Sequence, residues 1–117
     1  MAAAPERLST RARGLVESDE HELYLSAASA WEIAIKHGLG KLRLPEPPSR
    51  YVPSRVAMLR VLTLPIEHEH ALRVGELPPH HRDPFDRMLV AQAQIERLHI
   101  LTADSVFTKY DVEIIDA

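Results

Sequence analysis

Cysteine is absent from this 117-residue sequence, which excludes a disulfide framework, a thiolate zinc site and a cysteine nucleophile. Any bound metal ion would therefore depend on oxygen or nitrogen ligands. Aromatic side chains make up only 5% of the residues, and Trp31 is the single tryptophan, so there is little material for stacking nucleic-acid bases. The four glycines are scattered rather than gathered in a phosphate-binding loop, and no nucleophile-elbow motif is present.

The charges and the hydrophobic residues fit one small domain. Lys and Arg number 14 against 17 Asp and Glu, giving a net charge of −3, which excludes a globally basic nucleic-acid coat but allows a local basic groove. With 45% hydrophobic residues, a chain of this length is expected to fold as a single domain over residues 1–117. No apolar run approaches the roughly 20 residues that span a bilayer, and the N-terminus does not have the pattern of a signal peptide. We therefore expect no membrane association and a cytoplasmic location.

Hydrophobic periodicity and turn residues predict helices that alternate with short strands. Helices are expected at about residues 5–18, 30–37, 49–59, 67–75 and 84–97, strands at 23–25, 61–64, 99–102 and 112–115, and a turn or short helix at 104–110. Ser26 or Ser29 is the candidate N-cap of the second helix, whereas Asp83 and Pro84 mark the start of the last long one. This alternation is typical of an α/β domain with a mostly parallel sheet.

Three acidic residues are expected at the carboxyl edge of this sheet. Glu32 would lie in the first turn of the helix after the first strand, Asp86 in the first turn of the last long helix, and Asp104 just after the third strand. Ligands of open α/β sheets bind at this edge. Carboxylates gathered there, in a chain without cysteine, favour a Mg²⁺ or Mn²⁺ site that could activate water and offset the charge of a phosphodiester.

Each of these acids also has a purely structural interpretation. Ser29 and Glu32 have the spacing of a capping box, so Glu32 could simply bond back to the helix start. Asp83 and Asp86 could cap the last helix and complement its dipole, and Asp104 could cap a turn. Spacing alone leaves both interpretations open.

Histidines and large apolar residues give weaker signals. His68 and His70 stand two apart on a helix, where side chains point in different directions, so the His68-Glu69-His70 run is interpreted as a solvated face. For His80 and His81, in a loop beside Asp83, a functional role competes with a plain surface position. The expected core includes Trp31, Ile33, Ile35, Met88 and Leu89.

Three segments together resemble VapC-like PIN-domain toxins. The first is residues 24–42 around Ser-Ala-Trp-Glu-Ile, the second is residues 81–93, His-Arg-Asp-Pro-Phe-Asp-Arg-Met-Leu-Val-Ala-Gln-Ala, and the third is residues 101–104, Leu-Thr-Ala-Asp. Their order and spacing also match, so the resemblance covers nearly the whole chain.

The resemblance implies a PIN-like three-layer α/β fold and a metal-dependent endoribonuclease that acts on RNA as a toxin. It also implies two protein partners, a cognate antitoxin and a second copy in a homodimer. By position, Glu32, Asp86 and Asp104 match the family's catalytic, metal-binding acids, with Mg²⁺ or Mn²⁺ as cofactor. Asp83 would cap the helix of Asp86 or act as an outer partner.

One feature of the family is not found in the sequence. Family members usually open with a central apolar strand that ends in a further acid of the metal site, and that N-terminal strand is missing here. The domain is therefore interpreted as N-terminally truncated, with two strands left without their ladder partner.

The resemblance also leads us to expect phosphate contacts from Arg82, Arg87 and Lys36. Two other functions stay open. One is a catalytically impaired remnant that serves as an antitoxin-binding or dimerisation module. The other is a nuclease directed at DNA, since the same metal chemistry cleaves either polymer.

Overall fold

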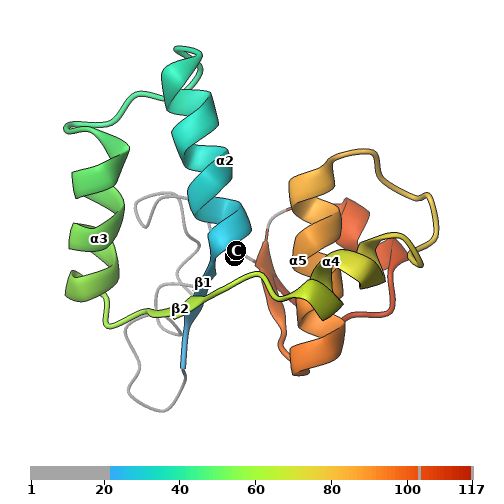
Figure 1. Ribbon diagram of the computed structural model, residues 1–117. Coiled ribbons are helices and arrows are strands. Elements are labelled where there is room, and N and C mark those ends of the chain that lie inside the picture. Colours follow the sequence, from blue (N-terminus) through green and yellow to red (C-terminus); the bar gives the residue numbers. More distant parts are fainter. Residues whose placement is uncertain (1–21, 103, 117) are drawn as a thin grey trace.

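The computed structural model describes residues 22–102 and 104–116, so the helix predicted over residues 5–18 lies outside it. The elements in Figure 1 are β1 (Tyr24–Ser26), α2 (Ala27–Gly38), α3 (Pro48–Met58), β2 (Leu62–Leu64), α4 (His68–Val74), α5 (Pro84–Glu96), β3 (Ile100–Thr102), the 3₁₀ helix η2 (Ser105–Lys109) and β4 (Ile114–Asp116). The order agrees with the predicted alternation of strands and helices. Among the described helices, none is long and apolar enough to cross a membrane.

The strands form two parallel pairs. β1 pairs with β2, with Tyr24 opposite Leu62, and β3 pairs with β4, with Ile100 opposite Ile114. The parallel pairing confirms the predicted α/β class, but the described strands make two two-stranded sheets rather than one continuous sheet. Within the described residues, β1 pairs with β2 alone and β3 pairs with β4 alone. A slot lined by β1, β3 and α5 separates the two pairs.

Figure 1 shows two groups of elements side by side. One contains β1, α2, α3 and β2, and we call it the β1–β2 half (residues 24–64). The other contains α4, α5, β3, η2 and β4, and we call it the β3–β4 half (residues 68–116). α2 packs against α5 across the boundary. There Trp31 meets the ring of Phe85 edge-on, with ring centroids 5.1 Å apart, so the two helices are held together near the start of α5.

The hydrophobic core lies in the β3–β4 half. Its buried residues are Leu77, Val90, Ala91, Ala93, Ile100, Phe107 and Tyr110. The prediction that Trp31 and Ile35 belong to the core is wrong, since these residues are 60% and 38% exposed. The reason is that α2 fully buries only the small residues Ala28 and Ser29 of its first turn. Ile33, Met88 and Leu89 are half-buried.

The prediction of a solvated face over residues 68–70 is wrong for His70, which is buried. Its ring is 1% exposed, Nδ1 accepts a hydrogen bond from the backbone N–H of Glu67 at 2.9 Å, and Nε2 lies 3.3 Å from Oε2 of Glu96. The predicted solvated face therefore holds for His68 but not for His70, because the packing of α4 against α5 turns His70 inward. Both ring nitrogens have partners, which is the condition for burying a histidine at low cost.

Candidate active site

The start of α5 carries a close group of polar side chains. Asp83 is the N-cap, since its Oδ1 accepts the backbone N–H of Phe85 at 2.8 Å and of Asp86 at 3.1 Å. Pro84 occupies the first helical position, where its missing N–H costs nothing. The predicted helix start is thereby confirmed. Asp86 makes no capping bond; its Oδ2 lies 2.7 Å from Nε2 of His81 instead.

Arg87 holds the loop that precedes α5. Its guanidinium donates to the backbone carbonyls of Val74 at 2.8 Å and of Pro78 at 3.0 Å. Longer bonds of 3.4 Å reach the carbonyls of Leu77 and His81 and the hydroxyl of Tyr110. The phosphate contact expected of Arg87 is therefore not supported, because its terminal nitrogens are already engaged within the chain. Of the three expected phosphate contacts, Arg82 is exposed and has no partner among the described residues.

Glu32 approaches from the β1–β2 half. It lies in the second turn of α2 and not in the first as predicted, because the helix begins at Ala27. Ser26 caps the helix by accepting the N–H of Ala28 at 3.0 Å, so the interpretation of Ser29 and Glu32 as a capping box is wrong. Oε2 of Glu32 pairs with Nζ of Lys36, one turn further along, at 3.0 Å.

Asp104 follows β3 and is the N-cap of η2. Its Oδ1 accepts the backbone N–H of Val106 at 3.0 Å, and its own N–H donates to Oγ1 of Thr102 at 3.1 Å. The structural interpretation of Asp104 as a cap is thereby confirmed. This role engages Oδ1 alone, and the residue is exposed, so a second role for its carboxylate is compatible with the cap.

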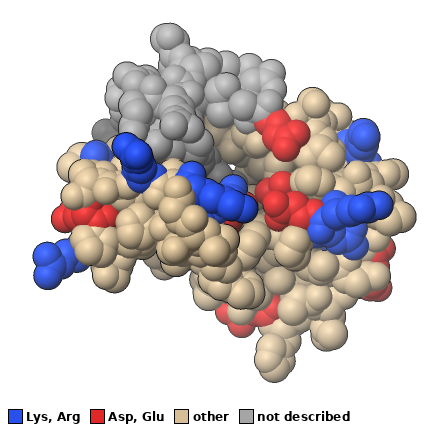
Figure 2. Space-filling model, turned by 90° about the horizontal axis from the view of Figure 1, so that it is seen from above, with Lys and Arg blue, Asp and Glu red and all other residues tan. Residues whose placement is uncertain are grey.

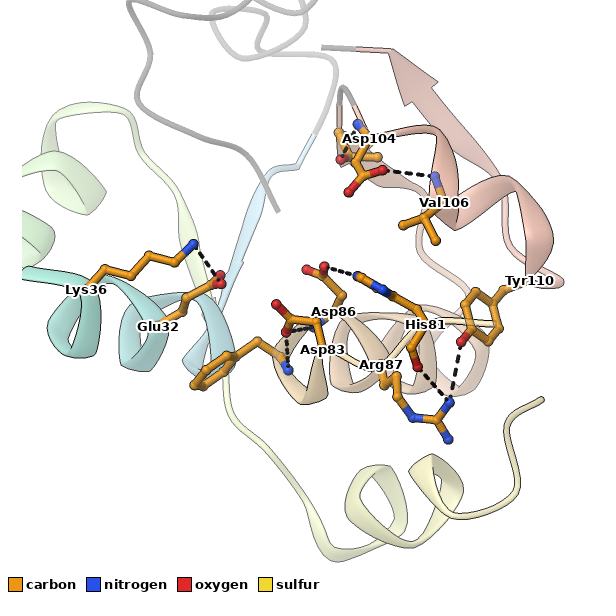
Figure 3. Close-up of polar contacts among 11 residues, drawn as sticks. Glu32, Lys36, His81, Asp83, Asp86, Arg87, Asp104, Val106 and Tyr110 are labelled. Carbon is orange, nitrogen blue, oxygen red and sulfur yellow. Dashed lines mark hydrogen bonds and ion pairs between the residues drawn. The ribbon is translucent and has the colours of Figure 1, made fainter. Parts of the chain in front are cut away.

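The three candidate acids come from three elements. Figure 3 shows Glu32 on α2, Asp86 on α5 and Asp104 after β3, with the ring of His81 beside Asp86. In Figure 2, acidic and basic side chains gather on both sides of a hollow in the face seen from above. His81, Asp83 and Asp86 form a group whose potential ligand atoms all lie within 4.8 Å of one another, as do Glu69, His70 and Glu96 elsewhere in the described chain. Glu32 and Asp104 stand outside both groups.

Burial raises the pKa of the Asp86 carboxyl above its ordinary value. The hydrogen bond with His81 acts in the opposite direction, whereas the negative charges of Asp83 and Glu32 raise this pKa further. Of these causes, the charge of Glu32 in the β1–β2 half is the smallest. A divalent cation would relieve this repulsion, and a set of carboxylate oxygens with one imidazole fits Mg²⁺ or Mn²⁺.

Sequence reasoning did not pair His81 with Asp86. The position of His81, two residues before the N-cap, could have indicated this pair. A loop that folds back over the first turn of a helix can bring a side chain at that position next to the third helical residue. That fold-back depends on Arg87, whose loop contacts come from residues 74 to 81 and are not visible in a local pattern.

The parallel strand pairs and the acidic group at the start of α5 define an α/β domain with a candidate cation site. The sequence profile of the PIN domain matches residues 2–113. The chain therefore belongs to the PIN domain family, which confirms the resemblance seen in its three segments.

One curated relative is similar over part of the chain. Ribonuclease VapC16 of Mycobacterium tuberculosis (strain ATCC 25618 / H37Rv) is 47% identical over 58 residues. The matched stretch is 50% of this chain and 41% of the relative, so the chain spans less than half the length of the relative it matches.

Proposed function

We propose that the protein is a metal-dependent endoribonuclease of the VapC type, the toxin of a toxin-antitoxin pair. The observation that carries the proposal is the half-buried carboxylate of Asp86 at the start of α5, grouped with Asp83 and His81, in a PIN-domain chain. The similarity to a protein named as a ribonuclease supports RNA as the substrate. A nuclease acting on cellular RNA would work in the cytoplasm.

Glu32, Asp86 and Asp104 are the residues that would hold Mg²⁺ or Mn²⁺. When bound, such an ion would activate a water molecule and offset the charge of the phosphodiester. The half-buried Asp86 carboxylate would be the best-fixed ligand, because its helix is capped by Asp83 and packed into the core. Glu32 would exchange its ion pair with Lys36 for the cation, which is a modest loss since exposed pairs contribute little. Arg82 would be free to contact an RNA phosphate.

A second candidate function is a binding module without catalysis, acting through an antitoxin or a second copy. The observation that favours it is an exposed apolar stripe on α2 and just beyond it, formed by Trp31, Ile35 and Leu39 at a spacing of four residues. Exposed apolar groups of this kind are typical of protein interfaces. The two functions are compatible, because the VapC-type proposal itself includes an antitoxin and a homodimer as partners.

The test compares acid-to-amide variants in the same chain. Asp86→Asn and Asp104→Asn are expected to lower Mn²⁺-dependent RNA cleavage by about 100-fold or more, since several kcal/mol of transition-state stabilisation depends on the cation. Both should also reduce the rise in melting temperature that the metal gives, without unfolding the metal-free protein. Asp111→Asn is the matched control, because Asp111 is exposed and lies beside Gln94 near the end of α5, whereas Asp86 lies at its start.

The outcomes separate the candidate functions. RNA cleavage by the unaltered chain that disappears in the Asp86 and Asp104 variants supports the nuclease. Cleavage of a DNA oligonucleotide at a comparable rate would instead favour the DNA-directed enzyme. The binding module would be supported if the chain shows no metal-dependent cleavage but forms an antitoxin complex, and if Trp31→Ala weakens that complex.

A further inference from the structure

The loop of residues 77–82 has a fixed backbone at the candidate site. Arg87 ties it to α5 at the carbonyls of Leu77, Pro78 and His81. The neighbouring His80 packs its ring edge-on against Tyr110, with centroids 5.2 Å apart. The position of His81 therefore does not depend on its own side chain.

The ring of His81 meets one oxygen of Asp86. Nε2 lies 2.7 Å from Oδ2, and the two side chains are 26% and 22% exposed. An ionised carboxylate can only accept hydrogen bonds, so Nε2 is the donor in this contact when Asp86 is ionised. The bond engages Oδ2 and leaves Oδ1 without a partner among the described residues.

We propose that His81 is a positioning residue, whose Nε2–H holds Oδ2 of Asp86 and so presents Oδ1 to a divalent cation. This inference rests on the proposed function, since it concerns how the same site binds its metal. Hydrogen-bonded outer partners of this kind orient metal-binding carboxylates, and their removal typically lowers metal affinity about 10- to 100-fold. The carboxylate of Asp86 needs such a partner because its side chain makes no bond to the helix backbone.

Direct coordination by His81 is the competing role. When Asp86 is ionised, Nε2 carries the hydrogen of this contact and has no lone pair to offer a cation. For His81 to be a ligand, this hydrogen bond would have to break. A nitrogen ligand would also raise the preference for Mn²⁺ over Mg²⁺, which gives the two roles different signatures.

The experiment uses three substitutions of His81 in the full chain. His81→Gln keeps an N–H donor about as far from the backbone as Nε2, whereas His81→Asn carries the same amide one methylene closer and cannot reach Oδ2. His81→Ala removes the donor altogether. His68→Ala is the matched control, an exposed histidine of α4 that does not contact the carboxylate. Calorimetry gives the Mn²⁺ and Mg²⁺ affinities, and RNA cleavage at increasing Mn²⁺ gives the metal concentration for half-maximal rate.

Positioning predicts a specific pattern. His81→Ala and His81→Asn should bind Mn²⁺ about 10- to 100-fold more weakly and need correspondingly more metal for cleavage, with much of the rate recovered at saturating metal. His81→Gln should lie close to the unaltered protein, and so should the control His68→Ala. Melting temperatures of the metal-free variants should agree within a few degrees, because Arg87 holds the loop.

Three outcomes would overturn the inference. Unchanged metal affinity in His81→Ala would show that Asp86 needs no partner. Equally weakened binding in His81→Gln and His81→Ala, with a reduced preference for Mn²⁺, would make His81 a direct ligand. A raised KM for RNA at unchanged metal affinity would make it an RNA contact. The variant Asp86→Asn distinguishes a failure of this inference from a failure of the proposed function. If Asp86→Asn binds metal as well as the unaltered protein does, Asp86 is not a metal ligand, and the proposed metal site itself is wrong.

Discussion

The two halves of the molecule bury their apolar side chains to very different degrees. In the β3–β4 half, Val90 and Ala91 are fully buried and Phe107 is 3% exposed. In the β1–β2 half, α3 has no buried residue, and Trp31 and Met58 are more than half exposed. The core that sets the stability of the fold is therefore concentrated on one side, and the second half contributes mainly small buried groups near the start of α2.

This difference matters because the candidate site draws on both halves. Asp86 and His81 are fixed by a capped helix and a tied loop that adjoin the core. Glu32 stands on α2, which packs against α5 of the β3–β4 half. Sites are most precise where their side chains are supported by packed elements. We infer a rigid portion of the site around Asp86 and an adjustable portion around Glu32.

The largest expected effect on stability comes from a substitution in the hydrophobic core of the β3–β4 half. Phe107→Ala should lower the free energy of unfolding by about 3–5 kcal/mol, because it empties a buried site. Trp31→Ala should lower it by only about 0.5–1.5 kcal/mol, since it removes little more than the edge-on packing of the indole against the ring of Phe85. Urea unfolding of both variants measures the difference. Equal reductions would contradict the contrast between the halves.

A smaller effect is expected at the two histidines of α4. His70→Ala should lower the free energy of unfolding by about 1–3 kcal/mol, because it removes the acceptor for the N–H of Glu67 and the contact with Glu96 in α5. His68→Ala, two residues earlier on the exposed face, should change it by less than about 0.5 kcal/mol. Thermal and urea unfolding measure both. A change in His68→Ala as large as in His70→Ala would mean that the packing of α4 against α5 is not what distinguishes them.

Features with a local chemical cause could be predicted from the sequence. The start of α5 follows from Asp83 and Pro84, since a side-chain acceptor followed by a residue without an N–H satisfies the first turn whatever surrounds it. The strands and their parallel arrangement followed from short apolar runs between helices. The capping role of Asp104 was one of two interpretations that its position allowed, and it needs only Val106 two residues on.

Features that depend on long-range packing could not be predicted. Ser26 and Ser29 are equally good caps locally, and the choice of Ser26 goes with its burial against Gln92 of α5, 66 residues away. Burial of His70 and exposure of Trp31 likewise depend on which helix packs where. The guanidinium of Arg87 looked like a phosphate ligand because its carbonyl partners in the loop come together only in the folded chain.

The smallest expected effect tests how the halves are coupled through charge. Burial raises the pKa of Asp86 above its ordinary value of 3.8. A raised pKa in the folded state means that the group's favourable contribution to stability is present below the unfolded-state pKa and is lost as the pH rises through the folded-state pKa. Without metal, Asp86→Asn should therefore be more stable than the unaltered protein at pH 7, and the two should converge below about pH 4. Urea unfolding across this range measures the difference.

A variant of Glu32 tests the same prediction further. Glu32 lies in the β1–β2 half, and its negative charge helps to raise the pKa of Asp86. In a Glu32→Gln background the stability increase from Asp86→Asn at pH 7 should be smaller, and the difference between the two increases is the coupling energy across the boundary. Added Mn²⁺ should reverse the order of stabilities, since the cation stabilises only the protein that keeps its ligand. If Asp86→Asn were instead less stable at pH 7 by about 1 kcal/mol without metal, the carboxylate would serve mainly to complement the dipole of α5. The electrostatic link between the halves would then be too weak to govern the site.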